Sequence, residues 1–467
     1  MRNQSKYLIV VLAAVLAFSS CKKFLDVQPE DRLTEDQAFS SKKNVDAGIN
    51  GLYLRASTAA LYGEKMTMST TEILAQRYNI PATHSRIKFS TMSYTDATVD
   101  KEMEAIWTNA YSIIFNSNLF RARLKKSPGI LDAKTDSVYQ GEALAIRAML
   151  HFDMLRLFGP MYNSKDSVLN SIPYCSQSEA IVTAFLPANV VMGNIVADLK
   201  QAERLITIDQ DKSFDKKYRF NYYSIKALQA RVYLYRGDKT SALAASKVLI
   251  DNQERYPWVL SANLTGDKTN SDRIFSTEMI LGIYNSDLYP TQQKIFGADV
   301  LAKDILAPID VRLLALYESN TLDYRYGYTQ LWRNTEVKSF KTFFKYTDVD
   351  DKSKPWRNTI PLLKISEMYY IAAECEPNKE TAIGYLNKVR LNRNIGVLPV
   401  TTTDVQLKGE ILKEYQKEFF GEGQLFFYYK RTNATSIPNG SAATGTIAMD
   451  PVKYVVLIPQ AEISNRN

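Results

Sequence analysis

The chain has 467 residues, of which 45% are hydrophobic and 23% charged, so it is long enough to bury a large core. Its formal net charge of +8 is spread without a dense Lys/Arg block, and nucleic-acid binding is therefore not indicated. Only two histidines are present, which argues against enzymes that need a histidine base or histidine-rich metal ligation. The sequence indicates no catalytic group, metal site or cofactor, and leaves open whether a metal ion steadies a loop.

The first twenty residues have the pattern of an export signal. A positive start is followed by an unbroken apolar run from Tyr7 to Phe18, two serines and Cys21. Twelve apolar residues rise only about 18 Å as a helix, which is too short to span a ~30 Å hydrocarbon core. We therefore predict that residues 1–20 are a cleaved signal peptide and that Cys21 becomes a lipidated N-terminus. The alternative is an ordinary secreted protein with an incidental cysteine.

Most of the remaining chain has the apolar periodicity of helices. This spacing predicts helices over 102–126 and 141–158, helix pairs over 221–251 and 361–392, and a last helix over about 404–420 with Asp404 as its N-cap. Each pair turns at residues that end helices, Gly237-Asp238 in the first and Pro377-Asn378 in the second. We interpret the pairs as tetratricopeptide-like hairpins within one domain, because they lie about 140 residues apart and lack the full repeat consensus.

Three features of these helices have a structural and a chemical interpretation. His151 lies in the apolar arc of 141–158, where a hydrogen-bonded core histidine is expected. Arg147 lies in the same arc and needs a carboxylate or carbonyl groups around it. Glu414, Glu418 and Glu422 are spaced four apart, and we expect them to pair with Lys/Arg or water and not to act as catalytic acids.

Two long irregular regions, about 75–99 and 252–358, are the expected ligand-contacting loops. Aromatic residues alternate over 324–332, so on a strand they would share one face and could stack on sugar rings. The alternative, that these rings pack a small sheet onto the helices, is favoured for most of them. The candidate ligand-binding residues are Tyr78, His84, Arg86, Tyr324, Tyr326, Tyr328 and Trp332.

Several motifs in order along the chain resemble those of the SusD/RagB family. Cys21 is followed by Phe24-Leu25-Asp26 and Pro29, and Leu457-Ile458-Pro459 with Glu462-Ile463 closes the chain. Between them lie Glu142–Ala148 with Leu157-Phe158-Gly159-Pro160, the stretch Ile360–Glu374, Leu386–Arg390, and Glu414–Arg431. The chain departs from the family pattern at Lys364, Gln424 and Tyr428, and Lys22-Lys23 replaces the acidic cluster associated with surface export. The combination spans nearly the whole chain.

The resemblance implies a mainly α, single SusD-like domain over 21–467, with long loops and short strands inserted between helix hairpins. It also implies a non-enzymatic, lipid-anchored protein of the cell outer membrane, exposed at the surface. Such a protein binds an oligosaccharide or a peptide and delivers it to a SusC-like TonB-dependent transporter. Two other functions stay open: a surface glycoside hydrolase and a helix-hairpin interaction scaffold that binds no ligand. The sequence also leaves open which ligand is bound and whether Cys175 and Cys375 form a disulfide.

Overall fold

The computed structural model describes residues 35–206, 217–328 and 331–466. The predicted signal peptide and Cys21 lie outside these residues. The chain divides into two compact units, residues 1–48 and 49–467. The first contains helix α2 (Glu35–Ala38) and the start of α3 (Lys42–Ala56), and the second contains all later elements. The predicted single domain over 21–467 stays a prediction.

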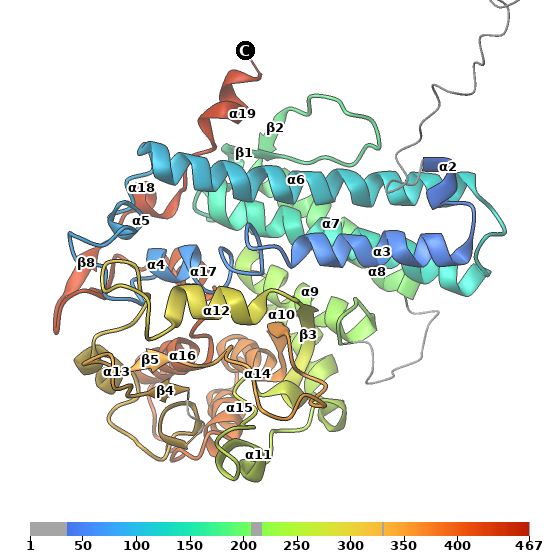
Figure 1. Ribbon diagram of the computed structural model, residues 1–467. Coiled ribbons are helices and arrows are strands. Elements are labelled where there is room, and N and C mark those ends of the chain that lie inside the picture. Colours follow the sequence, from blue (N-terminus) through green and yellow to red (C-terminus); the bar gives the residue numbers. More distant parts are fainter. Residues whose placement is uncertain (1–34, 207–216, 329–330, 467) are drawn as a thin grey trace, which may run out of the picture. The chain divides into compact units, whose positions relative to one another are not determined.

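The second unit is built on a stack of helices, each of which packs against the next (Figure 1). The stack contains α6 (Ala97–Lys126), α7 (Ala133–Phe158), α8 (Ala188–Ile206), α9 (Tyr222–Arg236), α10 (Lys239–Ile250), α14 (Ile365–Cys375), α15 (Lys379–Leu391) and α16 (Asp404–Glu418). The predicted pairs are therefore the hairpins α9–α10 and α14–α15. They are neighbours in space, since α10 packs directly on α14. The chain between them is thus an insertion into a continuous helical stack.

Polar side chains at the helix ends explain where the helices begin. Asp96 and Asp132 accept N–H groups at the starts of α6 and α7. Asn221 and Ser224 form a capping box at the start of α9, and Gly237 ends that helix in the left-handed conformation that glycine favours. The predicted N-cap Asp404 is wrong by one residue. Thr403 is the cap, because its hydroxyl accepts the N–H of Gln406 and the Gln406 side chain accepts the N–H of Thr403.

Helix α7 packs between α6 and α8 and is buried on all sides over residues 138–158. His151 is fully buried, its Nδ1 pairs with the Arg147 carbonyl, and its Nε2 accepts the Cys175 N–H. Burial lowers the pKa of His151 to about 3, so the ring stays neutral. Arg147 makes two hydrogen bonds of 2.6–2.7 Å to Asp198. Both predictions, a core histidine and a structural arginine, are confirmed.

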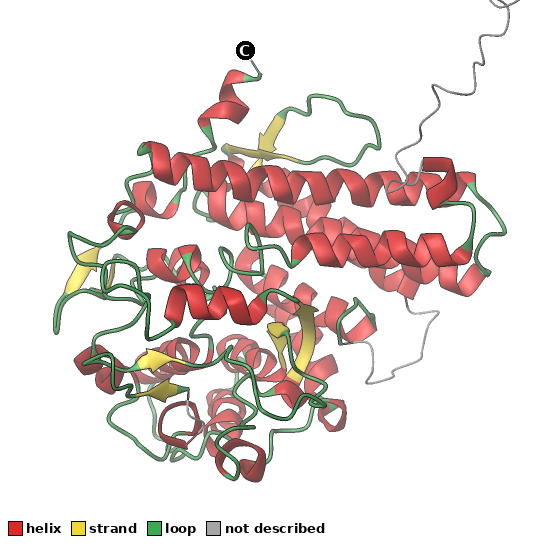
Figure 2. Cartoon of the chain, viewed as in Figure 1, coloured by secondary structure: helices red, strands yellow, loops and turns green. Residues whose placement is uncertain are grey.

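The insertion and the chain ends supply short elements around the stack (Figure 2). The additional helices are α4 (Thr70–Leu74), α5 (Ile87–Ser90), α11 (Ser261–Thr265), α12 (Leu288–Phe296), α13 (Asp310–Leu316), α17 (Leu425–Arg431), α18 (Pro451–Tyr454) and α19 (Gln460–Ser464), with single turns at Asp166–Val168, Gln253–Arg255 and Ser276–Glu278. In the described ranges the strands form only two-stranded antiparallel pairs. These are β1 (Asn170–Pro173) with β2 (Phe185–Pro187), β3 (Met279–Tyr284) with β6 (Thr359–Lys364), β4 (Trp332–Arg333) with β5 (Thr342–Phe343), and β7 (Ser436–Pro438) with β8 (Thr446–Ala448). The mainly α fold class is confirmed.

Residues 324–328 do not form the strand on which the alternating aromatic side chains would have shared one face. Residues Tyr324–Tyr328 form a π-helical turn, and only Trp332 begins a strand, β4. The alternation of aromatic residues therefore does not place them on one face of a sheet. Cys175 and Cys375 are both free thiols in this structure, which answers the question that the sequence left open.

Candidate functional site

The candidates from the first loop are held by other parts of the protein. Tyr78 is fully buried, and its hydroxyl donates to the Met68 carbonyl at 2.6 Å. His84 is 2% exposed, with its Nε2 3.2 Å from the Ile305 carbonyl and its Nδ1 accepting the Arg86 N–H, and burial lowers its pKa. The Arg86 guanidinium pairs with Glu102 at 2.7 Å. None of these three side chains lines any of the cavities described below, and their ligand role stays a prediction.

The candidates from the second loop are mostly packing residues. Tyr326 and Trp332 are each 6% exposed, with Tyr326 stacked on Tyr317 at 5.0 Å and Trp332 4.7 Å from Phe343 between ring centres. Tyr324 packs on the cluster of Val259, Leu264 and Phe275. The side chain of Tyr328 lies outside the described residues. The arrangement matches the packing interpretation that the sequence favoured.

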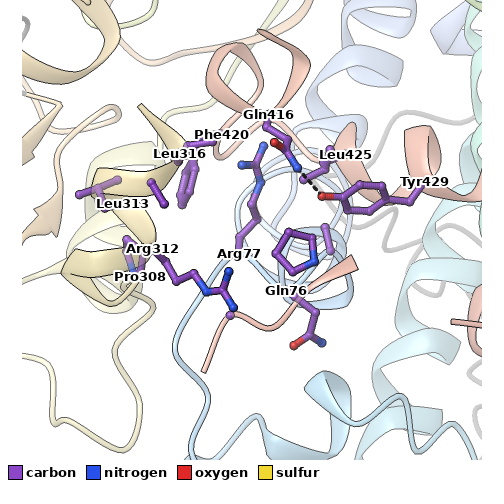
Figure 3. A pocket seen from close by; sticks show the side chains of 14 residues that line it. Gln76, Arg77, Pro308, Arg312, Leu313, Leu316, Gln416, Phe420, Leu425 and Tyr429 are labelled. Atoms are coloured by element: carbon purple, nitrogen blue, oxygen red, sulfur yellow. Dashed lines mark hydrogen bonds between the residues drawn. The ribbon is translucent and has the colours of Figure 1, made fainter. Parts of the chain in front are cut away.

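A cavity of about 180 Å³ lies beside these buried rings, and we call it the Arg77 cavity (Figure 3). Four segments that are far apart in the sequence form this cavity: the chain after α4, helix α13 with Pro308 before it, the α16–α17 region, and the β7–β8 hairpin. Its lining residues are Ala75, Gln76, Arg77, Pro308, Arg312, Leu313, Ala315, Leu316, Gln416, Phe420, Leu425, Tyr429, Pro438 and Gly440. The two irregular regions predicted from the sequence thus meet at this cavity.

The floor of the cavity is buried and the rim is partly exposed. Arg77, Phe420 and Tyr429 are 7%, 3% and 2% exposed, whereas Ala315 is exposed and Gln416 half-buried. The Arg77 guanidinium lies over the Phe420 ring at 4.7 Å from its centre. Gln416 donates from Nε2 to the Tyr429 hydroxyl at 2.8 Å (Figure 3). A ligand that enters therefore meets a guanidinium, an amide and a phenol below a rim with apolar carbons.

A glycine turn holds the carboxylate behind Arg77. Gly421 and Gly423 have φ angles of +73° and +71°, and their N–H groups donate to the two oxygens of Glu72 at 3.0 and 2.9 Å. A side chain at Gly423 would place its Cβ 1.9 Å from the Met66 carbonyl oxygen, so this position accepts only glycine. Burial raises the pKa of Glu72, and Arg77 and the two N–H groups oppose that rise. Arg77 Nε lies 3.5 Å from the same carboxylate.

A second hollow, of about 480 Å³, lies near the β3–β6 pair. It is lined by half-buried Tyr218 and Trp356, together with Asn263, Asn270 and Asp272. The Tyr218 hydroxyl donates to the Pro355 carbonyl at 2.9 Å, which fixes the ring beside the tryptophan loop. Aromatic rings beside amides are a surface on which a sugar could also stack.

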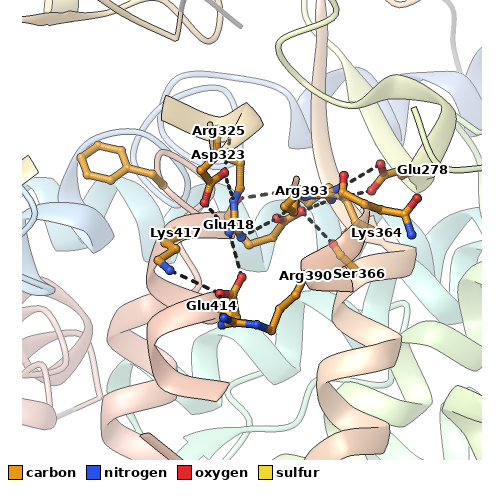
Figure 4. A network of polar contacts seen from close by, with 12 residues as sticks. Glu278, Asp323, Arg325, Lys364, Ser366, Arg390, Arg393, Glu414, Lys417 and Glu418 are labelled. Carbon is orange, nitrogen blue, oxygen red and sulfur yellow. Dashed lines mark hydrogen bonds and ion pairs between the residues drawn. The ribbon is translucent and has the colours of Figure 1, made fainter. Parts of the chain in front are cut away.

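The three glutamates of α16 and the turn after it form ion pairs, and Figure 4 shows those of Glu414 and Glu418. Glu414 pairs with Arg325 and Arg390, Glu418 with Arg325, Arg393 and Lys364, and Glu422 with Lys345 and Lys364. Burial alone would raise the pKa of Glu418, but Arg393 and Lys364 outweigh it, so its pKa lies well below the ordinary value. A general acid in glycoside hydrolysis needs the opposite shift. The expected pairing with Lys/Arg is confirmed.

Among the residues that the structure describes, no group of three or more His, Cys, Asp or Glu side chains is arranged to hold a metal ion. No helix in the same ranges is long and apolar enough to cross a membrane.

The residues that line the Arg77 cavity were not candidates from the sequence. Arg77 is adjacent to Tyr78, which was a candidate, but the side chains of neighbouring residues diverge. One signal was present: Arg77 is a charged residue in the mainly apolar run Ile73–Ile80, which indicates a buried charge. No comparable signal marks Arg312, Gln416 or Tyr429, because they reach the cavity only through tertiary packing.

These features define a helical-hairpin scaffold in which inserted loops build a small polar cavity. Residues 23–234 match a family model described as starch-binding and associating with the outer membrane, and residues 317–450 match the model of the SusD family. The chain belongs to the SusD/RagB family.

Two relatives come from Formosa agariphila. SusD-like protein P2 is 24% identical over an alignment of 496 positions, which covers 93% of each chain. SusD-like protein P38 is 24% identical over 251 residues, which cover 53% of this chain but only 45% of that protein.

Solved structures of the superfamily have the same fold. A SusD superfamily protein from Bacteroides thetaiotaomicron has a TM-score of 0.73 at 20% identity, covering 91% of this chain and 98% of that one. A SusD-like carbohydrate binding protein from Bacteroides vulgatus has a TM-score of 0.69 at 18% identity, covering 91% and 97%. A laminarin binding SusD-like protein has a TM-score of 0.62 at 17% identity, also covering 91% and 97%.

Proposed function

We propose that this protein captures oligosaccharides in the Arg77 cavity without transforming them. The observation that carries the proposal is the combination in one cavity of Arg77, Gln416 and Tyr429 with the apolar side chains of Leu313 and Leu316. Sugar hydroxyls need hydrogen-bonding partners of this kind, and the C–H faces of a sugar ring pack on aliphatic carbons. Drug-sized ligands occupy pockets of roughly 300–1,000 Å³. A cavity of about 180 Å³ therefore takes one terminal residue of a longer chain.

Comparison with other proteins supports this function. The model that matches residues 23–234 is described as starch-binding, and one structure with the same fold is of a protein that binds laminarin. The paired glutamates support a role in binding and not in hydrolysis, because ion pairs with Arg and Lys leave Glu414, Glu418 and Glu422 no free acid.

The protein's cellular role is part of the same proposal. Cys21 carries a lipid that anchors the chain to the outer membrane, with the ligand-binding unit at the cell surface. A SusC-like TonB-dependent transporter is the partner that receives the sugar. Contact with the transporter raises the effective ligand concentration there, so that modest affinity at one cavity is sufficient.

The test is a calorimetric titration of the purified protein with the oligosaccharides that it selects on a glycan array. Ala315 is exposed on the rim, so Ala315→Trp fills the entrance, whereas the same change at exposed Leu314, which does not line the cavity, is the matched control. We expect Ala315→Trp to weaken binding at least about tenfold, equal to about 1.4 kcal/mol, and Leu314→Trp to leave it within about twofold.

The products of a long incubation separate the alternatives. Intact oligosaccharide is the expected result, and release of shorter sugars would show a glycoside hydrolase. A protein that binds the transporter but no glycan or peptide would be an interaction scaffold. Binding that survives Ala315→Trp but is lost in Trp356→Ala would move the site to the second hollow.

A further inference from the structure

Resting on the proposed function, we infer that the Arg77 cavity selects acidic oligosaccharides, in which a carboxylate or sulfate group of the sugar pairs with the Arg77 guanidinium. The inference comes from the buried charge on the cavity floor.

The Arg77 guanidinium makes no hydrogen bond with any described residue, although Arg77 is 93% buried, since its exposed fraction is 7%. Its Nε and Nη2 atoms are buried without an acceptor. The nearest carboxylate is Glu72, at 3.5 Å from Nε, and both oxygens of Glu72 already accept N–H groups from Gly421 and Gly423. Because a buried donor without an acceptor is costly, this guanidinium is the one part of the floor that a ligand would complete.

Two other buried arginines of this chain have hydrogen-bond acceptors for all of their guanidinium nitrogens. Arg147 binds Asp198 with two nitrogens and Asn118 with a third. Arg393 binds both oxygens of Glu278 and both of Glu418. Arg77 has neither arrangement, and it is Arg77 that lines a cavity.

The charged residues that line the cavity also favour an acidic ligand. Arg77 and Arg312 are the charged residues among those that line the cavity, and no acidic side chain is among them. Arg312 donates to the neutral carbonyls of Ala442 and Gly445, at 2.7 and 2.6 Å, and has no ion pair with the described residues. Planar guanidinium groups pair with carboxylate and with sulfur or phosphorus oxyanions in a bidentate manner. An anionic substituent is therefore favoured over a neutral hydroxyl.

The experiment compares trigalacturonate with its methyl ester, which has the same backbone and no charge. Calorimetry of the full-length purified protein also includes a sulfated carrageenan oligosaccharide, neutral laminaritriose and the peptide trialanine. Arg77→Gln removes the charge, and Arg236→Gln, at an exposed position outside the cavity, is the matched control. Thermal unfolding checks that each variant is folded.

We expect at least one acidic probe to bind about tenfold or more tightly than the neutral sugars, and Arg77→Gln to abolish this preference while Arg236→Gln keeps it. Equal affinity for trigalacturonate and its ester, with no sulfate preference, would overturn the inference and leave glycan capture standing. If the protein binds none of these sugars and none on the glycan array, both the acidic preference and the proposed glycan capture are overturned. Arg77-dependent binding of trialanine alone would overturn the assignment to sugars. If Arg77→Gln does not fold, the ester comparison on the unaltered protein still decides the outcome.

Discussion

Buried cations in this protein are neutralised in different ways at the level of single residues. Arg147 has a carboxylate, whereas Lys430 donates only to the carbonyls of Arg156 and Gly159, at 2.8 and 2.7 Å. Both carbonyls lie at the end of α7, where the helix dipole favours a positive charge. Burial nevertheless lowers the pKa of Lys430 to about 7.

The variant Lys430→Met tests whether burial lowers the pKa of Lys430, because it removes this group's contribution to the pH dependence of stability. Because the pKa is about 7 in the folded protein and near its ordinary value of 10.5 in the unfolded chain, the unfolded state binds more protons between these values. The stability of the unaltered protein should therefore rise from pH 7 to pH 9.5, by about 1–3 kcal/mol more than that of Lys430→Met. Urea unfolding at both pH values measures the difference, and a pH-independent difference would contradict the account.

Tyr326 should contribute to stability, in contrast to the ligand role considered from the sequence. Its buried ring stacks on Tyr317, so Tyr326→Ala should lower the free energy of unfolding by about 3–5 kcal/mol. Tyr284, which is 45% exposed, is the control, and Tyr284→Ala should change it by about 0.5 kcal/mol or less. Chemical denaturation measures both. Unchanged stability of Tyr326→Ala with weakened glycan binding would restore the ligand role.

Ion pairs join α16 to the elements around it. Glu418 contacts Arg393 at 2.7 Å, Arg325 at 3.2 Å and the Ser366 hydroxyl at 2.9 Å (Figure 4). These partners come from the turn just after α15, the π-helical turn and α14. Through Arg325, the cluster therefore joins the insertion to the helices that follow it in the sequence.

Glu418→Gln should destabilise the fold, because it leaves Arg393 and Arg325 buried with less negative charge. We expect a loss of about 3–5 kcal/mol of unfolding free energy. Asp251→Asn removes an ion pair with Lys247 in which the side chains are 62% and 45% exposed, and should cost about 1 kcal/mol or less. Denaturant titration measures the loss of unfolding free energy in both variants. Equal losses would show that burial of the ion pairs does not increase their contribution to stability.

Helices were the elements that the sequence predicted well. Their apolar period and their caps, such as Asn221 with Ser224, are local in the chain. The alternation of aromatic residues over 324–328 does not mark a strand, because the rings of a π-helical turn can alternate in sequence and still pack in different directions. The contact of α10 with α14 could not be predicted from periodicity, because it requires the inserted chain between them to fold outside the helical stack.

On the scale of the whole molecule, the family resemblance predicted the fold but not the site. The Arg77 cavity combines segments around residues 76, 312, 416 and 438, and its chemistry exists only after these segments meet. The two loop regions were predicted as the place of ligand contact, and they supply Arg77 and Arg312. Their aromatic residues, in contrast, pack mostly in the interior.

The proposed lipid attachment concerns the whole protein and can be tested without its ligand. Cys21→Ala removes the proposed acylation site, so the variant should move from the detergent phase to the aqueous phase in a Triton X-114 partition. Mass spectrometry should find an acylated Cys21 as the N-terminus of the unaltered protein. An unmodified N-terminus in protein purified from its own cells would contradict the anchor.

A crystal structure of the protein soaked with trigalacturonate tests the central claim most directly. The account predicts an intact oligosaccharide whose terminal carboxylate lies within about 3 Å of an Arg77 guanidinium nitrogen, with Gln416 and Tyr429 beside the same sugar ring. Sugar found only at the Trp356 hollow, or only as cleaved fragments, would contradict it.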